Sequence, residues 1–275
     1  MTKKRKPTFA EVAKDIKDIK IQGARNIAGW ALYAYLLKPT KASIRNLKNL
    51  RPTEPMLTNV LDRLEKGEDY NKILDHFFEA QEEINKFVFE LIKDGDIIFT
   101  HCHSTNVGKA LIYAKKKGKK FEIYNTETRP LYQGRKTAKE LRAAGIKVTM
   151  FVDSALGIAL SGEQGTKKVS KIFLGADALL KKGIVNKVGS EVIAQVAKNQ
   201  KVSIYIIADS WKYSPKNLEL EKRDFDEVWK KIPKKSKIKI QNPAFEFVPK
   251  KYIKKIVTEF GCLRYHKFLR VVKKN

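Results

Sequence analysis

A cysteine between two histidines follows a short apolar run near the middle of the chain. The run, residues 97–99, predicts a buried strand, and the sequence Thr-His-Cys-His-Ser (100–104) comes directly after it. Ser104 or Thr105 can cap the helix that the following apolar spacing predicts, so its free backbone N–H groups would point at the same place. Cys102 is therefore either a catalytic thiol at a strand end or a small core residue.

Later strands are also predicted to end in polar residues. Five β-branched or aromatic runs alternate with helix-like stretches, which is the pattern of a parallel sheet built from βαβ units. These runs are residues 97–100, 121–127, 148–153, 171–177 and 202–209. Ligands of such sheets bind outside the carboxyl ends of the strands, near the point where the strand order reverses. The polar residues that end the later strands are Glu127, Arg129, Asp153, Ser154, Asp177, Asp209 and Lys212.

The segment after Asp177 predicts an anion site. We interpret it as a loop that places Asn186 and Lys187 just before the next helix, where an amide and an amine suit a phosphate group. Arg129 and Gln133 follow the second strand, and they either bind a second anion or form a loop salt bridge with an acidic neighbour.

Several common motifs are absent from the sequence. The chain has no GxGxxG, and Gly108 and Lys109 lack the other residues of a P-loop, which argues against dinucleotides and nucleoside triphosphates. His101 and His103 have no convincing third ligand, so no metal site is predicted. No GxSxG elbow supports an acyl hydrolase.

The first third of the chain predicts helices alone. Residues 8–20 carry a helical apolar stripe behind a capping-box sequence, and residues 21–37 begin at Gly23 and run into an apolar helix. Residues 73–93 predict a long amphipathic helix.

The composition changes at residues 94–96, which divides the chain into two predicted domains. We expect an all-helical N-terminal domain over 1–94 and a Rossmann-like, parallel-sheet domain over 95–275, with a helix at 250–260 near its end. The predicted fold class is α/β.

Composition limits the classes of protein. The chain has 275 residues, 43% of them hydrophobic, which is enough for a core, and two cysteines far apart, which argues against a disulfide framework. The net charge of +27 makes RNA binding an alternative interpretation. However, the lysines are spread along the chain, as is typical of a lysine-rich proteome or a thermophile surface. No apolar run has the length of a membrane span and no signal peptide is evident, so we expect a cytoplasmic protein.

A series of short motifs extends over nearly the whole chain. These motifs are IQGARNIA (21–28), RPT (51–53), THCHS (100–104), TETRPLYQG (126–134), VDSA (152–155), GAD (175–177), GIVNKVG (183–189), ADSWKYSP (208–215) and NPAFEFVPKKYI (242–253). Together they resemble one superfamily, which contains the regulatory subunits of translation initiation factor 2B, methylthioribose-1-phosphate isomerase and archaeal ribose-1,5-bisphosphate isomerase. The THCHS and WKYSP sequences look most like the last branch.

The resemblance implies a site between the two domains and a homodimer that can assemble further into a hexamer. The cysteine and aspartate that carry the chemistry of the isomerases match Cys102 and Asp177, and no cofactor is required. We assign Arg129, Gln133 and Asp153 as supporting residues. The predicted substrate-binding residues are Gly23, Arg51, Ser104, Thr105, Asn106, Asn186, Lys187 and Lys212.

One position departs from the family's pattern. The isomerases usually carry arginine before the glycine of the first motif, where this chain has Gln22, and Arg25 is expected to be turned elsewhere by the helix that starts there. Losing a charge-assisted phosphate contact costs about 1.5–3 kcal/mol.

The leading hypothesis is an isomerase that converts ribose 1,5-bisphosphate into ribulose 1,5-bisphosphate. Cys102 would be the base, its thiolate favoured by the helix N-terminus and nearby cations, and Asp177 would be an acid with a pKa raised by burial. Two alternatives stay open: a regulatory or binding protein like the subunits of initiation factor 2B, with initiation factor 2 as a partner, and a methylthioribose-1-phosphate isomerase.

Overall fold

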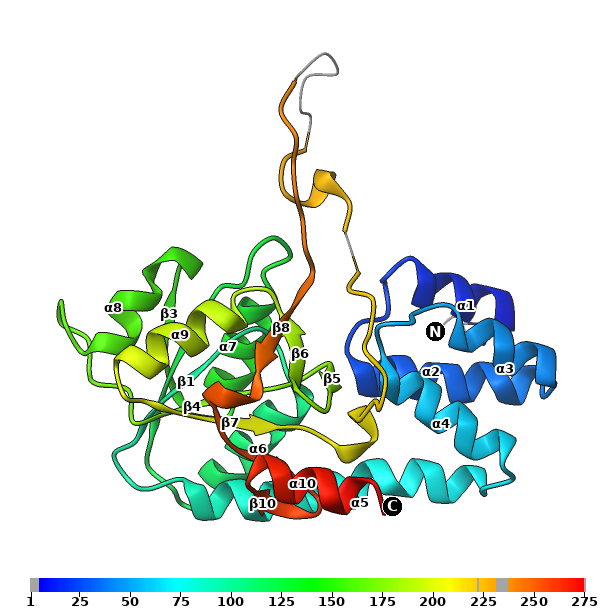
Figure 1. The fold of residues 1–275 in the computed structure, drawn as a ribbon, viewed down its shortest axis with the longest axis horizontal. Helices are drawn as coiled ribbons and strands as arrows, with labels where there is room; N and C mark the ends of the chain where they lie inside the picture. Colours follow the sequence, from blue (N-terminus) through cyan, green and yellow to red (C-terminus); the bar gives the residue numbers. More distant parts are fainter. Residues whose placement is uncertain (1–4, 222, 231–236, 275) are drawn as a thin grey trace.

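The computed structural model describes residues 5–221, 223–230 and 237–274 (Figure 1). The chain begins with helices and continues into an α/β sandwich, as the sequence predicts. The helices of the first part are α1 (Phe9–Lys17), α2 (Ala24–Leu37), α3 (Lys41–Lys48), α4 (Pro55–Glu65) and α5 (Tyr70–Leu91). Within the described ranges, no helix is long and apolar enough to cross a membrane.

Local sequence signals explain how the first helices begin. The predicted capping box is present at α1, where the Thr8 and Glu11 side chains each bond the other's backbone N–H. Gly23 is the N-cap of α2 and has φ +86°, a conformation that a side chain disfavours. The helices then pack around their own core, which includes Ile27 and Leu57 and which Trp211 joins from the later part of the chain.

The large sheet has seven strands in the order β10-β9-β7-β4-β1-β2-β3. All neighbouring strands are parallel except β9 and β10. The strands are β1 (Ile97–Thr100), β2 (Glu122–Thr126), β3 (Lys147–Phe151), β4 (Lys171–Leu174), β7 (Ser203–Ile207), β9 (Ile253–Thr258) and β10 (Gly261–Leu263). The five predicted strands are therefore confirmed, and the class is α/β.

Helices cover both faces of this sheet. Successive side chains of β1 point to opposite faces, so Ile98 packs with α5, α6 and α7 while Phe99 packs with α8, α9 and α10. The covering helices are α6 (Thr105–Lys116), α7 (Gln133–Ala143), α8 (Leu156–Ser161), α9 (Ser190–Asn199) and α10 (Tyr265–Val272).

Helix α5 links the two parts of the molecule. Ile73 and Phe77, in its first half, belong to the helical core, whereas Ile84 and Val88, in its second half, belong to the core of the sheet. A domain boundary at residue 94 stays a prediction, and α5 contributes to the cores on both sides of it.

Two predictions for the second half of the chain are wrong. The segment after Asp177 is not a plain loop, because β5 (Ala178–Leu179) and β6 (Gly183–Lys187) form a second, antiparallel sheet with β8 (Phe245–Pro249). The helix expected at 250–260 is instead a short 3-10 turn, Lys250–Tyr252, followed by β9. Ile253, Ile256 and Val257 have helical spacing, but pairing with β7 makes them a buried strand.

Candidate active site

The strand order reverses between β1 and β4. From β1 the chain moves outward through β2 and β3, and it then returns to place β4 on the other side of β1. The loops that leave these two strands diverge, so a crevice forms at their carboxyl ends. Cys102 follows β1 and Asp177 follows β4, which brings both predicted catalytic residues to this crevice.

A cavity at this point is lined by residues of both parts of the chain. All ten residues predicted as catalytic or substrate-binding line it, and Gln133 does as well. Arg129 and Asp153 do not. From the helical part the lining residues include Gln22, Gly23, Arg25, Arg51 and Glu54, and from the sheet side Cys102, Ser104, Thr105, Asn106, Gln133, Asp177, Asn186, Lys187, Lys212 and Arg223.

The backbone of Cys102 is held in an unusual conformation. Its φ is 63°, in the left-handed region that residues other than glycine seldom adopt. Its N–H donates to Thr128 Oγ1 at 3.0 Å, and its carbonyl accepts from Thr137 Oγ1 at 2.8 Å. Two side chains from the β2–α7 region therefore stabilise a strained position at the strand end.

Burial controls the protonation of both predicted catalytic groups. It raises the pKa of the Cys102 thiol to about 12, whereas the positive charge of Lys187 acts in the lowering direction. Lys187 therefore favours the thiolate, as expected of a nearby cation, but burial outweighs this effect, and the pKa of the thiol is raised rather than lowered. Burial also raises the pKa of Asp177, against the lowering effect of Lys212 and Lys187.

The start of α6 lies against the loop after β4. Ser104 is the N-cap of α6, and its Oγ accepts from Val107 N at 3.4 Å. Gly175 approaches it so closely that a Cβ at this position would lie 2.6 Å from both Cβ and Oγ of Ser104. Glycine is thus required here for the two strand-end loops to meet.

Asn186 and Lys187 lie at the end of β6, close before α9. Asn186 Nδ2 donates to Ser190 Oγ at 2.9 Å, and this hydroxyl donates to the Lys187 carbonyl at 2.7 Å. Both residues are buried. A rigid strand and the first residue of a helix therefore hold the amide and the amine in the cavity wall.

Lys212 is positioned by an aromatic stack between the two parts of the molecule. Its Nζ donates to the Ala176 carbonyl at 2.7 Å, next to Asp177. The turn that carries Lys212 is held by Asp209, which accepts from Trp211 N at 2.9 Å, and by His76 of α5, whose ring stacks on Trp211 at 3.6 Å.

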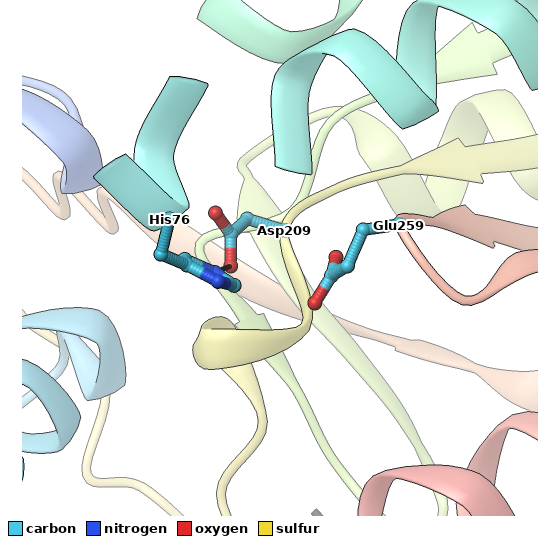
Figure 2. Close-up of side chains that lie close together, drawn as sticks. All are labelled: His76, Asp209 and Glu259. Atoms are coloured by element: carbon cyan, nitrogen blue, oxygen red, sulfur yellow. Dashed lines mark hydrogen bonds and ion pairs between the residues drawn. The ribbon is translucent and has the colours of Figure 1, made fainter. Parts of the chain in front are cut away.

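Three side chains of metal-ligand type, from different segments of the chain, lie beside the same turn (Figure 2). The ligand atoms of His76, Asp209 and Glu259 all lie within 4.8 Å of one another. They also bond protein groups: His76 Nε2 is 3.2 Å from Asp209 Oδ1, and Glu259 accepts from Ser210 N at 3.1 Å. Hydrogen bonding alone thus accounts for the arrangement.

The supporting residues outside the cavity hold loops. Asp153 accepts from the backbone N–H groups of Thr128 and Arg129, at 2.9 and 2.6 Å. The Arg129 guanidinium donates to Tyr132 Oη at 2.9 Å and to the Val228 carbonyl at 3.1 Å. Arg129 therefore does not contribute a positive charge to the lining of this cavity.

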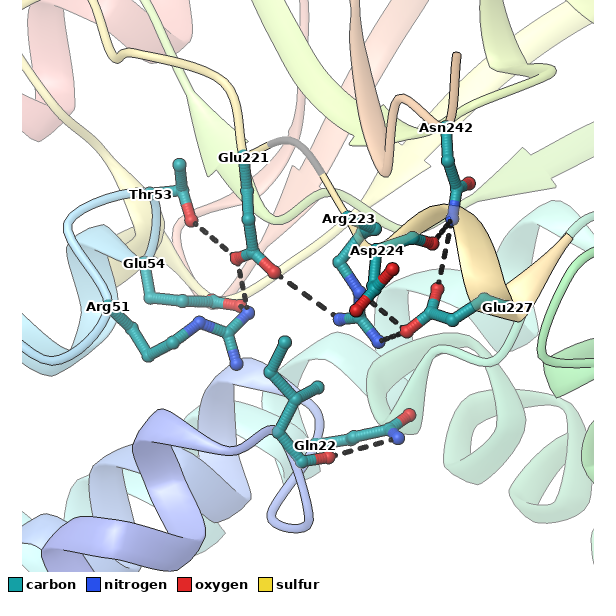
Figure 3. Close-up of polar contacts among 10 residues, drawn as sticks. Gln22, Arg51, Thr53, Glu54, Glu221, Arg223, Asp224, Glu227 and Asn242 are labelled. Carbon is teal, nitrogen blue, oxygen red and sulfur yellow. Dashed lines mark hydrogen bonds and ion pairs between the residues drawn. The ribbon is translucent and has the colours of Figure 1, made fainter. Parts of the chain in front are cut away.

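The charged residues in or next to the cavity that were not singled out as site residues from the sequence include Glu54, Glu221, Arg223 and Arg25. Glu221 and Arg223 form an ion-pair network with Arg51 (Figure 3), in which Glu221 Oε2 is 3.0 Å from Arg51 Nη2 and Arg223 Nη1 is 3.3 Å from Glu221 Oε1. Glu54 lies beside this network, with its Oε1 3.5 Å from Arg51 Nη2. Arg25 also lines the cavity, with its guanidinium over the Phe78 ring at 5.0 Å. Only Glu54, three residues after Arg51, had a local signal in the sequence.

The fold and the site define an α/β protein with a helical N-terminal region, which places a thiol and a carboxyl among buried cations at the switch point of a parallel sheet. The Initiation factor 2 subunit family model matches residues 26–265. The chain belongs to this family.

Similar proteins include sugar-phosphate isomerases. The ribose 1,5-bisphosphate isomerase of Methanocaldococcus jannaschii is 35% identical, over 92% of this chain and 90% of that protein. The methylthioribose-1-phosphate isomerase 1 of Pseudothermotoga lettingae is 31% identical, over 94% and 87%. Among solved structures, 5-methylthioribose 1-phosphate isomerase from Pyrococcus horikoshii has a TM-score of 0.81 at 25% identity, with 97% and 88% coverage. Translation initiation factor eIF-2B from the same organism has a TM-score of 0.80 at 25% identity, with 93% and 96% coverage.

Replacing Gly175 by alanine should damage the site, because the new Cβ would overlap Ser104. We expect a loss of about 1–3 kcal/mol in the free energy of unfolding, measured by urea denaturation. Gly157→Ala is the matched control, since a Cβ there meets nothing within 4 Å and the residue lies in α8. Equal stabilities for the two variants would contradict the close approach at Gly175.

Proposed function

We propose that the protein is an aldose–ketose isomerase that converts ribose 1,5-bisphosphate into ribulose 1,5-bisphosphate. The observation that carries the proposal is that one cavity brings together the partly exposed Cys102 and Asp177 with the buried cations Arg51, Lys187 and Lys212. Two phosphates need several cations, and proton transfer at carbon needs an acid and a base kept away from water. The similarity to isomerases of two sugar phosphates supports the reaction class.

The reaction starts with proton transfer inside the site. The pKa values of Cys102 and Asp177 are both raised, and the negative charge of Asp177 adds to the rise at the thiol. Moving one proton from Sγ to the carboxylate produces a thiolate beside a neutral acid. In this state the thiolate can act as the base and the neutral Asp177 as the acid, and the pair carries a single negative charge in the cavity.

The substrate then opens and isomerises. Asp177 donates its proton to the ring oxygen as the bond between this oxygen and C1 breaks, and the Cys102 thiolate removes the proton from C2. The resulting C1–C2 enol returns its hydroxyl proton to Asp177 while Cys102 gives its proton to C1. Both groups end as they began, the phosphate stays on C1, and C2 becomes the ketone. No cofactor enters these steps.

The cations hold the two phosphates. Lys187 and Asn186 lie at the end of β6, and Lys212 is anchored beside Asp177, so these groups are ordered before the substrate arrives. Ordered donors cost little rearrangement when charge develops on the substrate. Thr105 and Ser104, at the start of α6, add the backbone donors of a helix N-terminus.

Removing either proton-transfer group should abolish turnover. Cys102→Ser and Asp177→Asn are each expected to lower kcat for ribose 1,5-bisphosphate by roughly 100-fold or more. The product is measured as ribulose 1,5-bisphosphate by chromatography. Cys262→Ser, which changes a cysteine outside the cavity lining, should keep wild-type activity. Full activity in both site variants would exclude this mechanism.

A substrate comparison separates the two isomerase activities. Because the cavity contains cations for two phosphates, we expect kcat/KM for ribose 1,5-bisphosphate to exceed that for methylthioribose 1-phosphate by about tenfold or more. The reverse ratio would assign the other substrate. If neither sugar is converted while initiation factor 2 is retained by the immobilised protein at low salt, the regulatory alternative is favoured.

Restoring the arginine of related isomerases should strengthen substrate binding. Gln22 lines the cavity, and Gln22→Arg would add a charged donor there. We expect KM for ribose 1,5-bisphosphate to fall by about tenfold, the effect of one charge-assisted contact. Gln200→Arg adds the same charge at the end of α9 and should leave KM unchanged. An unchanged KM in Gln22→Arg would show that position 22 does not face a phosphate.

We also propose that the protein forms a homodimer, with a hexamer as a possible higher assembly. Exposed apolar side chains support self-association: Met150 and Val152, at the edge strand β3 and just after it, are 45% and 56% exposed. Light scattering after size-exclusion chromatography gives the mass directly.

A further inference from the structure

Glu54 is a buried carboxyl that the proposed mechanism does not use. It precedes Pro55 at the start of α4, is 2% exposed and lines the cavity. Its Oε1 lies 3.5 Å from Arg51 Nη2, while its Oε2 has no hydrogen-bond partner among the described residues. An acid with one unbonded oxygen therefore lies in the wall of the space in which the substrate is proposed to bind.

Arg51 beside it is also incompletely bonded. Its Nη2 pairs with Glu221 and Glu54, but its Nε and Nη1 have no partner among the described residues, although the side chain is buried. Figure 3 shows one guanidinium nitrogen turned away from both carboxylates. Buried donors without partners are costly, so this place fits a ligand group rich in oxygen atoms.

The surroundings keep Glu54 neutral near physiological pH. Burial raises its pKa to about 8, and the negative charge of Asp177 acts in the same direction. Arg51 and Lys212 oppose this effect, and Glu221 adds to it. A neutral carboxyl has an O–H to donate and does not repel an incoming anion, whereas the ionised form would do so.

We propose that Glu54 is a substrate-positioning residue whose neutral carboxyl donates a hydrogen bond to a phosphoryl oxygen that Arg51 binds. This inference rests on the proposed isomerase function. It follows that the affinity for an anion at this end of the cavity depends on the protonation of one group, the Glu54 carboxyl. The affinity is highest where Glu54 is neutral, and it falls by up to tenfold per pH unit as the pH rises past the pKa of the acid.

The test compares Glu54→Gln, Glu54→Ala and the wild type. Glutamine keeps an N–H donor but cannot ionise. Between pH 7.5 and 9.5, where phosphate monoesters are already dianionic, the wild-type KM for ribose 1,5-bisphosphate should rise roughly tenfold or more. In Glu54→Gln it should stay nearly constant. Glu54→Ala should raise KM about tenfold at pH 7.5 with kcat changed little.

A second measurement does not depend on turnover. Calorimetric titration with sulfate, whose charge is constant over this pH range, should show the same loss of affinity in the wild type and its absence in Glu54→Gln. Glu68→Gln, outside this cavity, is the matched control and should behave as the wild type. Circular dichroism checks that each variant is folded.

The outcomes separate the two proposals. Turnover with equal pH dependence in the wild type and Glu54→Gln would overturn the role of Glu54 and leave the isomerase function intact. Absence of turnover with the expected sulfate result would overturn the isomerase function and keep Glu54 as an anion-binding group. Equal sulfate affinities at both pH values in the wild type would refute the proton linkage.

Discussion

The site depends on the direct pairing of β1 with β4. Ile98 and Phe99 lie opposite Lys171 and Ile172 in a parallel register, so the two strands end beside each other. A buried ion pair between Lys171 and Asp96 links the other ends of the strands. Because β1 and β4 are almost completely buried on both faces, the two loops that carry the thiol and the carboxyl have little freedom in their separation.

The pKa values of the acids in this crevice reflect two opposing effects: burial, which raises them, and neighbouring cations, which lower them. Burial dominates for Cys102, Asp177 and Glu54, and each of these acids has a raised pKa. Lysines and arginines in the same cavity reduce these shifts without cancelling them. Acids with raised pKa values among several cations leave a net positive field, which suits a ligand with several negative charges. The same groups would repel one another if all of them ionised.

Sequence patterns predicted the parts of the molecule whose structure is determined by residues adjacent in the sequence. The central strands are buried apolar runs, and Ser104 is a helix cap, so their positions follow from the adjacent residues. Ile253 could not be placed in this way, because its apolar neighbours fit a helix equally well and only pairing with β7 selects the strand. Glu221 reaches Arg51 from a distant, highly charged segment, and no local pattern encodes such a contact.

The first part of the chain supplies what the sheet alone lacks. The strand ends provide the thiol, the carboxyl and two lysines, whereas Arg51, Glu54 and Gln22 come from the helical region. Helix α5 belongs to both cores, and its His76 stacks on Trp211, the residue before Lys212. A shift of the helical region would therefore move Lys212 together with Arg51. The placement of these two cations in the cavity and the relative position of the two parts are thus mechanically coupled through one helix and one aromatic stack.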